Sequence, residues 1–447
     1  MLYRILALIK ISMLFLSFGV LAYDPLVEET LQSPQIKHVM DFLKENGYQS
    51  KPEIFIETYN AELVDRDDFN DSDEIFKFSS SSVKYNGGDF WFYDYQKSEN
   101  YILVDYELNV THLQLKLKTV NTEMLFSLLP KLTYLAIDVD DVDDVVLNLK
   151  SNKNLKELYL KSGIVDDVIL PVDSSLEMIG TSRGEFKHIS NFKKQNKLSL
   201  LKINNGVSNL SDINGHQSLE LLILISGDGG KYNVDLFGFP NLKYLYVYGD
   251  RENNLSKLHR LTNLEVLFTG GGAYLGDVKL PETLRVLRFG GTINNKMPDF
   301  SNSNNLKKII ISYASFSEIK GLDGLDGLEE LTIYNTPLEK ISGLDGLSGL
   351  KKLKIERSNI KKVENVSHLS ALEYLVLVSN KINAVGELDG LSSIKEIELQ
   401  RNNLNHVDLS KFNAVKGCKV FLGSNPFFDN SEGEMRRKLI SLAKYGA

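Results

Sequence analysis

Cysteine and tryptophan are almost absent from this 447-residue sequence, which contains one of each. The lone cysteine, Cys418, excludes an internal disulfide framework and any zinc or iron–sulfur site that needs several cysteines. A net basic charge is also absent: 59 Asp and Glu outnumber 51 Lys and Arg, and the formal net charge of -8 argues against a nucleic-acid partner because phosphates require a basic face. The remaining composition, with 43% hydrophobic and 25% charged residues, is that of a globular protein.

The first 22 residues have the features of a secretory signal. Arg4 and Lys10 supply early positive charge, and residues 11–22 form an apolar run that is short for a bilayer span of ~20 residues. Ala22 provides a small residue before a possible cleavage site at Tyr23. We therefore predict a Sec-type signal peptide over 1–22 and a secreted, periplasmic or cell-surface protein without integral membrane insertion after signal removal. An uncleaved membrane anchor is the alternative.

An internal repeat of about 22 residues occupies most of the chain. Its clearest copies begin at residues spaced exactly one repeat apart, namely Leu306, Leu328, Leu350, Leu372 and Ile394. Weaker copies precede them and begin at Val110, Leu132, Leu155, Leu176, Leu198, Leu219, Leu242, Leu264 and Leu284. The register predicts a repeat array of about 15 coils over 110–427, because a sustained period of this length is the signature of a solenoid.

Within each copy, apolar residues at positions 4 and 6 have the two-residue period of a short strand. Further apolar residues at positions 11, 14, 17 and 20 return the chain along the other side, facing the same core. Asn380, Asn402 and Asn425 occupy position 9, where an asparagine side chain can bond the backbone of a turn. No single coil can bury its apolar face, so stacking of neighbours must build the core.

The resulting pattern, LxxLxLxxNxIxxIxxLxxLxx, resembles leucine-rich repeat proteins with repeats of about 22 residues, of the internalin-like or protein-phosphatase-regulator-like bacterial type. The resemblance implies an α/β solenoid: a horseshoe with a parallel concave β-sheet, an N-terminal α+β cap and a C-terminal helical cap. It also implies recognition of a protein partner on the concave face.

The segments that flank the array are predicted to be its caps. In the region 23–109 we expect a helix over 26–46, a hairpin around Asn86-Gly87-Gly88 and a strand over 101–110. Residues 428–447 are predicted to form an amphipathic capping helix.

Signals for catalysis and metal binding are weak. Gly180 to Gly184 matches the G-x-S-x-G pattern, but the register puts Ser182 on a concave strand rather than at the strand-to-helix turn of a hydrolase. The acidic runs 65–74 and 138–144 lack the glycine and glutamate spacing of a calcium loop. We therefore predict no enzyme, no cofactor and no metal site, with a serine hydrolase as the least favoured alternative.

Positions 3, 5 and 7 of each coil point out of the predicted concave sheet. In three consecutive coils these positions are apolar or aromatic, although outward positions on a soluble protein are normally polar. With the adjacent arginine, the predicted binding residues are Leu221, Ile223, Ile225, Tyr244, Tyr246, Tyr248, Val266, Phe268 and Arg288.

Three alternatives remain open for this patch. A loop or the cap can fold over it, a one-residue slip of the register would turn the same side chains inward, or the patch can mediate self-association in an envelope protein. The favoured hypothesis is a secreted or cell-envelope module that binds a protein of unknown identity.

Overall fold

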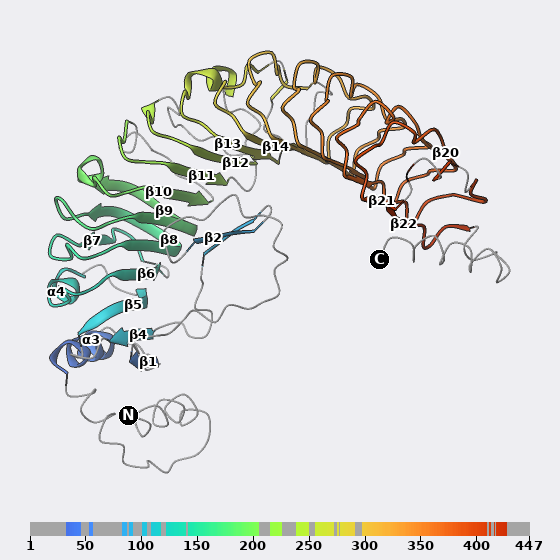
Figure 1. Ribbon diagram of the computed structural model, residues 1–447. Coiled ribbons are helices and arrows are strands. Elements are labelled where there is room, and N and C mark those ends of the chain that lie inside the picture. The colour runs from blue at the N-terminus through green and yellow to red at the C-terminus, as the bar shows by residue number, and fades with distance from the viewer. Residues whose placement is uncertain are drawn as a thin grey trace, which may run out of the picture.

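The computed structural model describes a curved stack of short parallel strands (Figure 1). The described residues are 33–45, 53–56, 83–86, 89–92, 101–104, 109–117, 122–139, 142–204, 215–225, 238–249, 255–271, 275–276, 278–290, 297–408, 411–412, 415 and 417–426. The predicted signal over 1–22 and the predicted helix over 428–447 lie outside these residues.

Each repeat contributes one strand to the concave sheet, and each strand pairs in parallel with the strand of the next repeat. From β6 to β21 each strand begins two residues after the predicted start of its repeat. The strands are β5 (Val110–Leu117), β6 (Tyr134–Val139), β8 (Glu157–Ile169), β9 (Met178–Ser190), β10 (Leu200–Asn204), β11 (Leu221–Ile225), β12 (Tyr244–Tyr248), β13 (Val266–Gly270), β14 (Val286–Gly290), β15 (Lys308–Ser312), β16 (Glu330–Tyr334), β17 (Lys352–Glu356), β19 (Tyr374–Val376), β21 (Glu396–Glu398) and β22 (Lys419–Phe421).

The core lies between these strands and the returning segments, as the register predicts. Ile309 and Ile311 on β15 point into the core and are fully buried. The returning segment of a later repeat contributes Ile360, Val363 and Val366, which are also fully buried. Because successive strand residues face opposite sides, the alternate residues of β15 are only partly buried.

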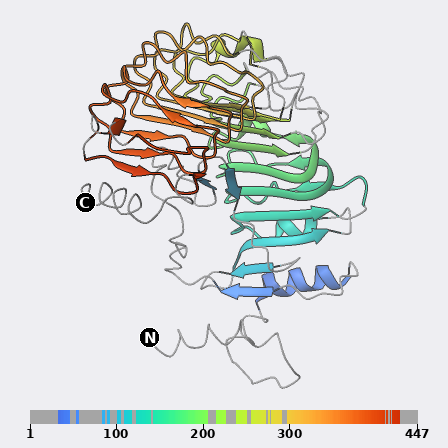
Figure 2. The same cartoon turned by 90° about the vertical axis from the view of Figure 1, so that its right-hand side faces the viewer.

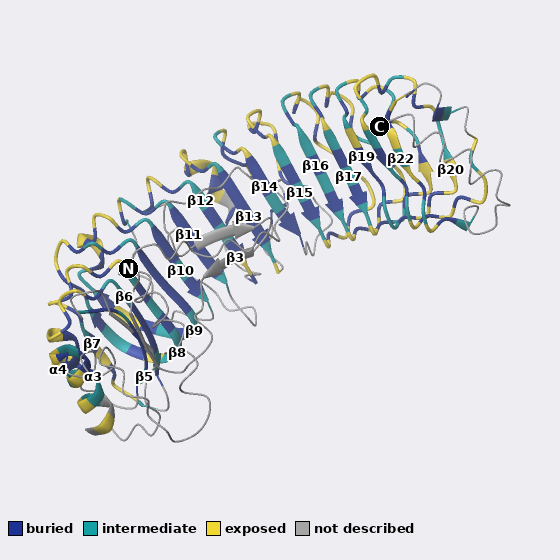
Figure 3. Ribbon diagram, turned by 60° about the horizontal axis from the view of Figure 1, so that its bottom comes forward, coloured by how far each residue is buried: buried dark blue, intermediate teal, exposed yellow. Residues whose placement is uncertain are grey.

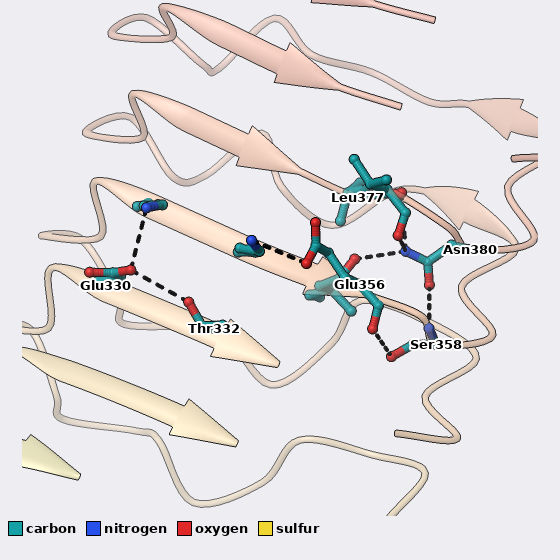
Figure 4. A network of polar contacts seen from close by, with 10 residues as sticks. Glu330, Thr332, Glu356, Ser358, Leu377 and Asn380 are labelled. Atoms are coloured by element: carbon teal, nitrogen blue, oxygen red, sulfur yellow. Dashed lines mark hydrogen bonds and ion pairs between the residues drawn. The ribbon is translucent and has the colours of Figure 1, made fainter. Parts of the chain in front are cut away.

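An asparagine ladder joins the last repeats, which confirms the predicted role of position 9. Asn380 donates to the carbonyl oxygens of Ile355 (2.7 Å) and Leu377 (3.1 Å) and accepts from the Ser358 N–H at 3.2 Å (Figure 4). Asn402 and Asn425 repeat this arrangement one coil further on each time. Each buried amide therefore satisfies backbone groups from two coils at once.

A second asparagine ladder, which the sequence analysis did not anticipate, joins repeats of the earlier half. Here the asparagine is the residue just before the first leucine of a repeat, and its side chain donates to a backbone oxygen of the preceding turn. The donors and acceptors are Asn154 to Pro130 (2.8 Å), Asn241 to Gln217 (2.7 Å), Asn263 to Pro240 (2.8 Å) and Asn305 to Glu282 (3.0 Å). The sequence signal that could have predicted this ladder is an Asn-Leu pair that recurs at multiples of about one repeat length.

A helix, α3 (Pro34–Glu45), lies at the N-terminal end of the stack. Its Ile36 and Val39 are fully buried within the solenoid core. The side chain of Gln35 accepts from the Val110 N–H at 2.8 Å, which fixes the helix to the start of β5. The predicted helix over 26–46 is thus present in its described part, while the cap as a whole includes residues outside the described ranges.

Four further strands and a short helix lie in the N-terminal part of the sequence. Strand β1 (Glu53–Ile56) pairs in parallel with β4 (Tyr101–Val104), and β4 pairs antiparallel with β5. The predicted hairpin is confirmed as β2 (Val83–Asn86) and β3 (Asp89–Phe92), which pair antiparallel. The helix α4 is Glu123–Ser127.

Irregular segments fill the convex side. The small elements there are β7 (Val146–Asn148), η1 (Phe192–Lys194), η3 (Leu255–Arg260), β18 (Lys362–Val363) and β20 (Ala384–Val385). β7 pairs with the second half of β8, and β18 pairs with β20, both in parallel.

Candidate binding surface on the concave face

The strand register places the predicted binding residues side by side. Leu221 lies opposite Tyr244, which lies opposite Val266. The same pairing joins Ile223, Tyr246, Phe268 and Arg288, and joins Ile225 to Tyr248. The one-residue slip that would have turned this set inward is therefore excluded.

Apart from Tyr248 and Arg288, these side chains belong to two apolar clusters that are separate from the solenoid core. Tyr244 and Tyr246 pack against both clusters and so join them. We call the combined surface the apolar strip, which runs from β8 to β14 on the concave face. Its members are Tyr159, Met178, Leu200, Leu221, Ile223, Ile225, Tyr244, Tyr246, Val266, Phe268 and Val286.

Four members of the apolar strip were missed by the sequence analysis: Tyr159, Met178, Leu200 and Val286. The signal was present in the register, because Met178, Leu200 and Val286 all stand at position 3 of their repeats. Scanning that column alone gives six consecutive repeats with a large apolar or aromatic residue.

The expectation that the patch is exposed is wrong for its central residues. Leu221 and Ile223 are 0% and 1% exposed, and Val266 and Phe268 are 6% and 3% exposed. Tyr244 and Tyr246, which lie on β12 between these closed residues, are partly exposed, as are Ile225 and Arg288, and Tyr248 is 46% exposed. The closed residues therefore lie on either side of a more accessible row of tyrosines.

Aromatic rings set the shape of the apolar strip. Tyr246 and Phe268 meet edge to face, with ring centroids 6.0 Å apart. A Cβ at Gly180 would lie 2.7 Å from the Tyr159 ring, and a Cβ at Gly270 would lie 2.9 Å from the Tyr248 ring. Both tyrosines therefore lie over the glycine of the next strand, which no larger residue could replace without displacing the ring.

One basic side chain, Lys202, is enclosed within the apolar strip. It lies on β10 between Gly180 of β9 and Ile223 of β11. Burial lowers the pKa of Lys202 to about 8, because desolvation disfavours the charged ammonium. Burial also raises the pKa of the Tyr244 hydroxyl, which belongs to β12.

The concave face from β15 to β21 has a different chemistry. Glu330 accepts from Lys308 at 3.1 Å and lies 3.5 Å from Lys352, while Lys354 and Glu356 are 3.1 Å apart. We call this surface the charged strip; part of it is drawn in Figure 4. Figure 3 shows the contrast, with β11 and β13 mostly buried and β15 to β17 alternating between buried and partly exposed.

Outside these surfaces the structure gives little support to other chemistry. Ser182 lies inside the continuous strand β9 rather than at a strand-to-helix elbow, which is the geometry that a nucleophilic serine of that motif requires. Within the described ranges, no three His, Cys, Asp or Glu side chains gather in an arrangement that could hold a metal. Cys418 is buried, and burial raises the pKa of its thiol to about 11, as expected for a packing residue.

Comparison with known proteins gives similarity at the level of structure only. No family model and no curated protein matches the sequence. A solved internalin of Listeria monocytogenes is 17% identical with a TM-score of 0.47, and the match covers 70% of this chain and 86% of the internalin chain. A leucine-rich repeat protein of Leptospira interrogans is 19% identical with a TM-score of 0.49, and the match covers 76% of this chain and 82% of the Leptospira chain.

Membrane insertion by helices finds no support in the part of the chain that the structure describes, where no helix has the length and apolar character to cross a bilayer. The 22-residue register, the one parallel strand per repeat and the asparagine ladder define the architecture. On these grounds the chain is a leucine-rich repeat solenoid with turns of about 22 residues.

Proposed function

We propose that this protein is a secreted or cell-envelope recognition module that binds a protein partner on the concave face of its repeats. The observation that carries the proposal is the apolar strip, a set of apolar and aromatic side chains on the sheet face opposite the core. A sheet that faces water on one side alternates apolar and polar residues, so an apolar second face needs a cover.

The tyrosines of β12 are the part of the strip that a partner can reach first. Tyr244 and Tyr246 are partly exposed and Tyr248 is 46% exposed. Tyrosine is enriched in protein interfaces because it combines a large apolar ring with a hydroxyl group and has few rotatable bonds. We propose Tyr246 and Tyr248 as the centre of the contact.

The test is affinity capture from the native envelope or the medium, followed by mass spectrometry, with wild type and two variants. Tyr246→Glu with Tyr248→Glu should reduce recovery of the captured protein at least tenfold. Thr332→Glu, at the same repeat position as Tyr246 but in the charged strip, should leave recovery unchanged. If the tyrosine variant captures the same protein as well as wild type does, the concave-strip assignment is wrong.

Self-association through the same strip is the other outcome that this experiment must separate. Light scattering after size exclusion reports the mass of the purified chain directly. A strict monomer excludes self-association. If the wild type is a dimer and Tyr246→Glu with Tyr248→Glu converts it to a monomer, the partner on the concave face is a second copy of this chain.

Export is part of the proposal and rests on the sequence of residues 1–22. The exported chain should begin at Tyr23, as measured by the intact mass of the protein recovered outside the cytoplasm. A mass that retains the first 22 residues in the membrane fraction would support the uncleaved anchor instead.

A further inference from the structure

The residues directly after the concave strands of the later repeats have a left-handed backbone. They stand at position 8 of their repeats and have positive φ angles, which are 55° for Tyr313, 52° for Asn335, 48° for Arg357, 57° for Ser379 and 57° for Arg401. The N–H of each donates to the carbonyl oxygen at position 7 of the next repeat, over 3.0 Å, or 3.3 Å for Arg357. Because these bonds join one coil to the next, any residue at position 8 must adopt this conformation.

The residue types at position 8 differ in how well they suit a left-handed backbone. Two earlier repeats have Gly249 and Gly271 there, and glycine adopts a positive φ without a steric cost. Tyr313 and Arg357 have long side chains on a Cβ, which makes the same backbone strained. Strain of this kind persists most often where the side chain has a function, so these two residues direct attention to what their side chains do.

The two strained residues flank a third side chain, and together they form a stack across three repeats. The rings of Tyr313 and Tyr334 meet edge to face, with centroids 5.7 Å apart and an interplanar angle of 72°. On the other side, the guanidinium carbon of Arg357 lies 5.3 Å from the centre of the Tyr334 ring. Tyr313 is 61% exposed and Arg357 is also exposed. We call these three residues the tyrosine–arginine stack.

The tyrosine–arginine stack lies at the ends of the strands, beyond the apolar strip. Figure 2 shows the later strands, in orange and red, stacked so that their ends follow one edge of the sheet. Tyr248 of β12 stands at position 7, as Tyr334 does, so the open tyrosine of the apolar strip lies on the same side of the strand ends. A partner on the concave face can therefore contact both.

The edge that carries the stack is basic, although the net charge of the whole chain is -8. Positions 8 to 10 of the five repeats from β15 to β21 include Arg357, Lys381 and Arg401 and no Asp or Glu. We call these positions the basic rim, which comprises residues 313–315, 335–337, 357–359, 379–381 and 401–403. The basic rim therefore has a formal charge of opposite sign to that of the protein.

Carboxylates beside the basic rim are paired with lysines outside it. Glu356 lies 3.1 Å from Lys354, and Glu339 lies 2.7 Å from Lys361. In the part of the chain that the structure describes, the ion pairs include none with the three cations of the rim. The charge of the rim is thus available to a ligand of negative charge.

Tyrosine and arginine are the side chains that most often dominate protein interfaces, and arginine can bind a carboxylate with two parallel hydrogen bonds. We propose that the tyrosine–arginine stack and the basic rim bind an acidic segment of the protein partner. Its carboxylates would pair with Arg357 and Arg401, and an apolar or aromatic side chain beside them would pack on Tyr313. The inference rests on the proposed function in one respect, namely that the partner is a protein.

Fluorescence polarisation with a labelled acidic peptide tests this contact without the natural partner. The probe consists of three Glu-Tyr-Glu-Gly units and is titrated with the full-length protein. We expect saturable binding, and at least tenfold weaker binding of matched peptides that have Gln or Lys in place of Glu. High salt should weaken the binding of the acidic peptide because it screens exposed charges.

Two arginine variants locate the binding. Arg357→Gln should weaken binding of the acidic peptide at least fivefold, because the guanidinium of the stack is lost. The matched control is Arg285→Gln, which removes an arginine with a side chain 63% exposed directly before β14, at the opposite end of the strands. It should leave the affinity unchanged. An acidic peptide that does not bind, equal affinity for all three peptides, or an equal response to both variants overturns the proposal.

Tyr313→Asn separates binding from packing, because asparagine adopts a positive φ more readily than tyrosine does. The urea midpoint of this variant should equal or exceed that of wild type, while its affinity for the acidic peptide should fall at least threefold. A lower urea midpoint with unchanged peptide affinity would show that Tyr313 is a packing residue and would contradict its place in the site.

The peptide measurements and the capture of a partner can fail separately. If the acidic peptide does not bind, the basic rim loses its assigned role, while a partner captured through Tyr246 and Tyr248 still supports the proposed function. If the peptide binds at Arg357 and no protein can be captured, the proposed function is contradicted and the acidic-peptide site remains.

Discussion

The two halves of the concave face are built on the same register but expose different surfaces. From β9 to β14 the first outward position of every strand is apolar or aromatic, and β11 and β13 are buried on both faces. Between β15 and β17 buried and partly exposed residues alternate strictly. The comparison shows that the repeat pattern fixes which residues face the core, while positions 3, 5 and 7 are free to differ from one coil to the next.

The two halves also fasten their turns differently. The later repeats use buried asparagines at the end of the strand, such as Asn402, which is 5% exposed. Several earlier repeats use exposed asparagines just before the first leucine, such as Asn263. Asn152 is an exception in the earlier half, because it is fully buried and donates to the carbonyl oxygens of Phe126 and Leu129. Because a buried amide left without partners is costly, the buried asparagines should contribute more to stability than the exposed ones.

The largest effect is expected from a comparison of two isoleucine substitutions, one in each half of the concave face, which tests the difference in burial directly. Ile223→Ala in the apolar strip should lower the free energy of unfolding by about 3 kcal/mol, since a fully buried side chain loses its contacts and leaves a cavity. Ile310→Ala, at the same repeat position in β15, should cost about 1 kcal/mol or less because it is already partly exposed. Urea denaturation followed by circular dichroism measures both. Equal losses would show that the two halves are covered alike.

The next largest effect is expected from a comparison of two lysine substitutions, the first of which should raise the free energy of unfolding. Lys202→Met should raise the free energy of unfolding at pH 7 by about 2 kcal/mol, because a charged ammonium is no longer desolvated on folding. Lys354→Met, at the same position in the charged strip, should change it by less than about 0.5 kcal/mol.

The pH dependence of Lys202 distinguishes desolvation from a packing effect. Its pKa is about 8 in the folded chain, below the ordinary lysine value of 10.5, so the unfolded state binds more protons between these two pH values. The contribution of Lys202 to stability therefore improves as the pH rises from 8 to 10.5. The advantage of Lys202→Met should shrink over that interval, and an advantage that stays constant with pH would contradict the assignment.

The smallest effect is expected from the ion pairs of the charged strip. Glu330→Gln removes contacts with Lys308 and Lys352 and should cost about 0.5 kcal/mol at low salt. The difference from wild type should disappear near 1 M salt, where screening is short-ranged. Ile223→Ala, measured under the same conditions, should keep its full effect because burial does not depend on screening. A salt-independent loss in Glu330→Gln would indicate a packing role instead.

The repeat start points could be predicted because one physical requirement recurs every 22 residues: apolar side chains at fixed positions must meet those of the next coil. The positions of Leu132 and Ile394 therefore located β6 and β21 without further information. The hairpin was predictable for a similar local reason, since Asn86-Gly87-Gly88 supplies the turn.

The exposure of the patch could not be predicted in the same way. Ile223 and Ile310 are the same residue at the same position, yet only the first is fully buried. Their neighbours across the sheet differ: Ile223 lies between Lys202 and Tyr246, whereas Ile310 lies between Arg288 and Thr332. Burial on this face therefore depends on which side chains the neighbouring strands bring together, and a repeat pattern does not state this.

The sequence by itself determined the repeat length, the parallel sheet, the core positions and most of the β11 to β13 part of the apolar strip. These follow from local periodicity and nearest-neighbour stacking, which each coil encodes within its own residues. The tertiary structure alone decided that Leu221, Ile223, Val266 and Phe268 are closed while the tyrosines of β12 stay partly open. That outcome depends on how side chains of neighbouring strands pack against one another on the concave face, so the accessible part of a solenoid is a property of the assembled stack.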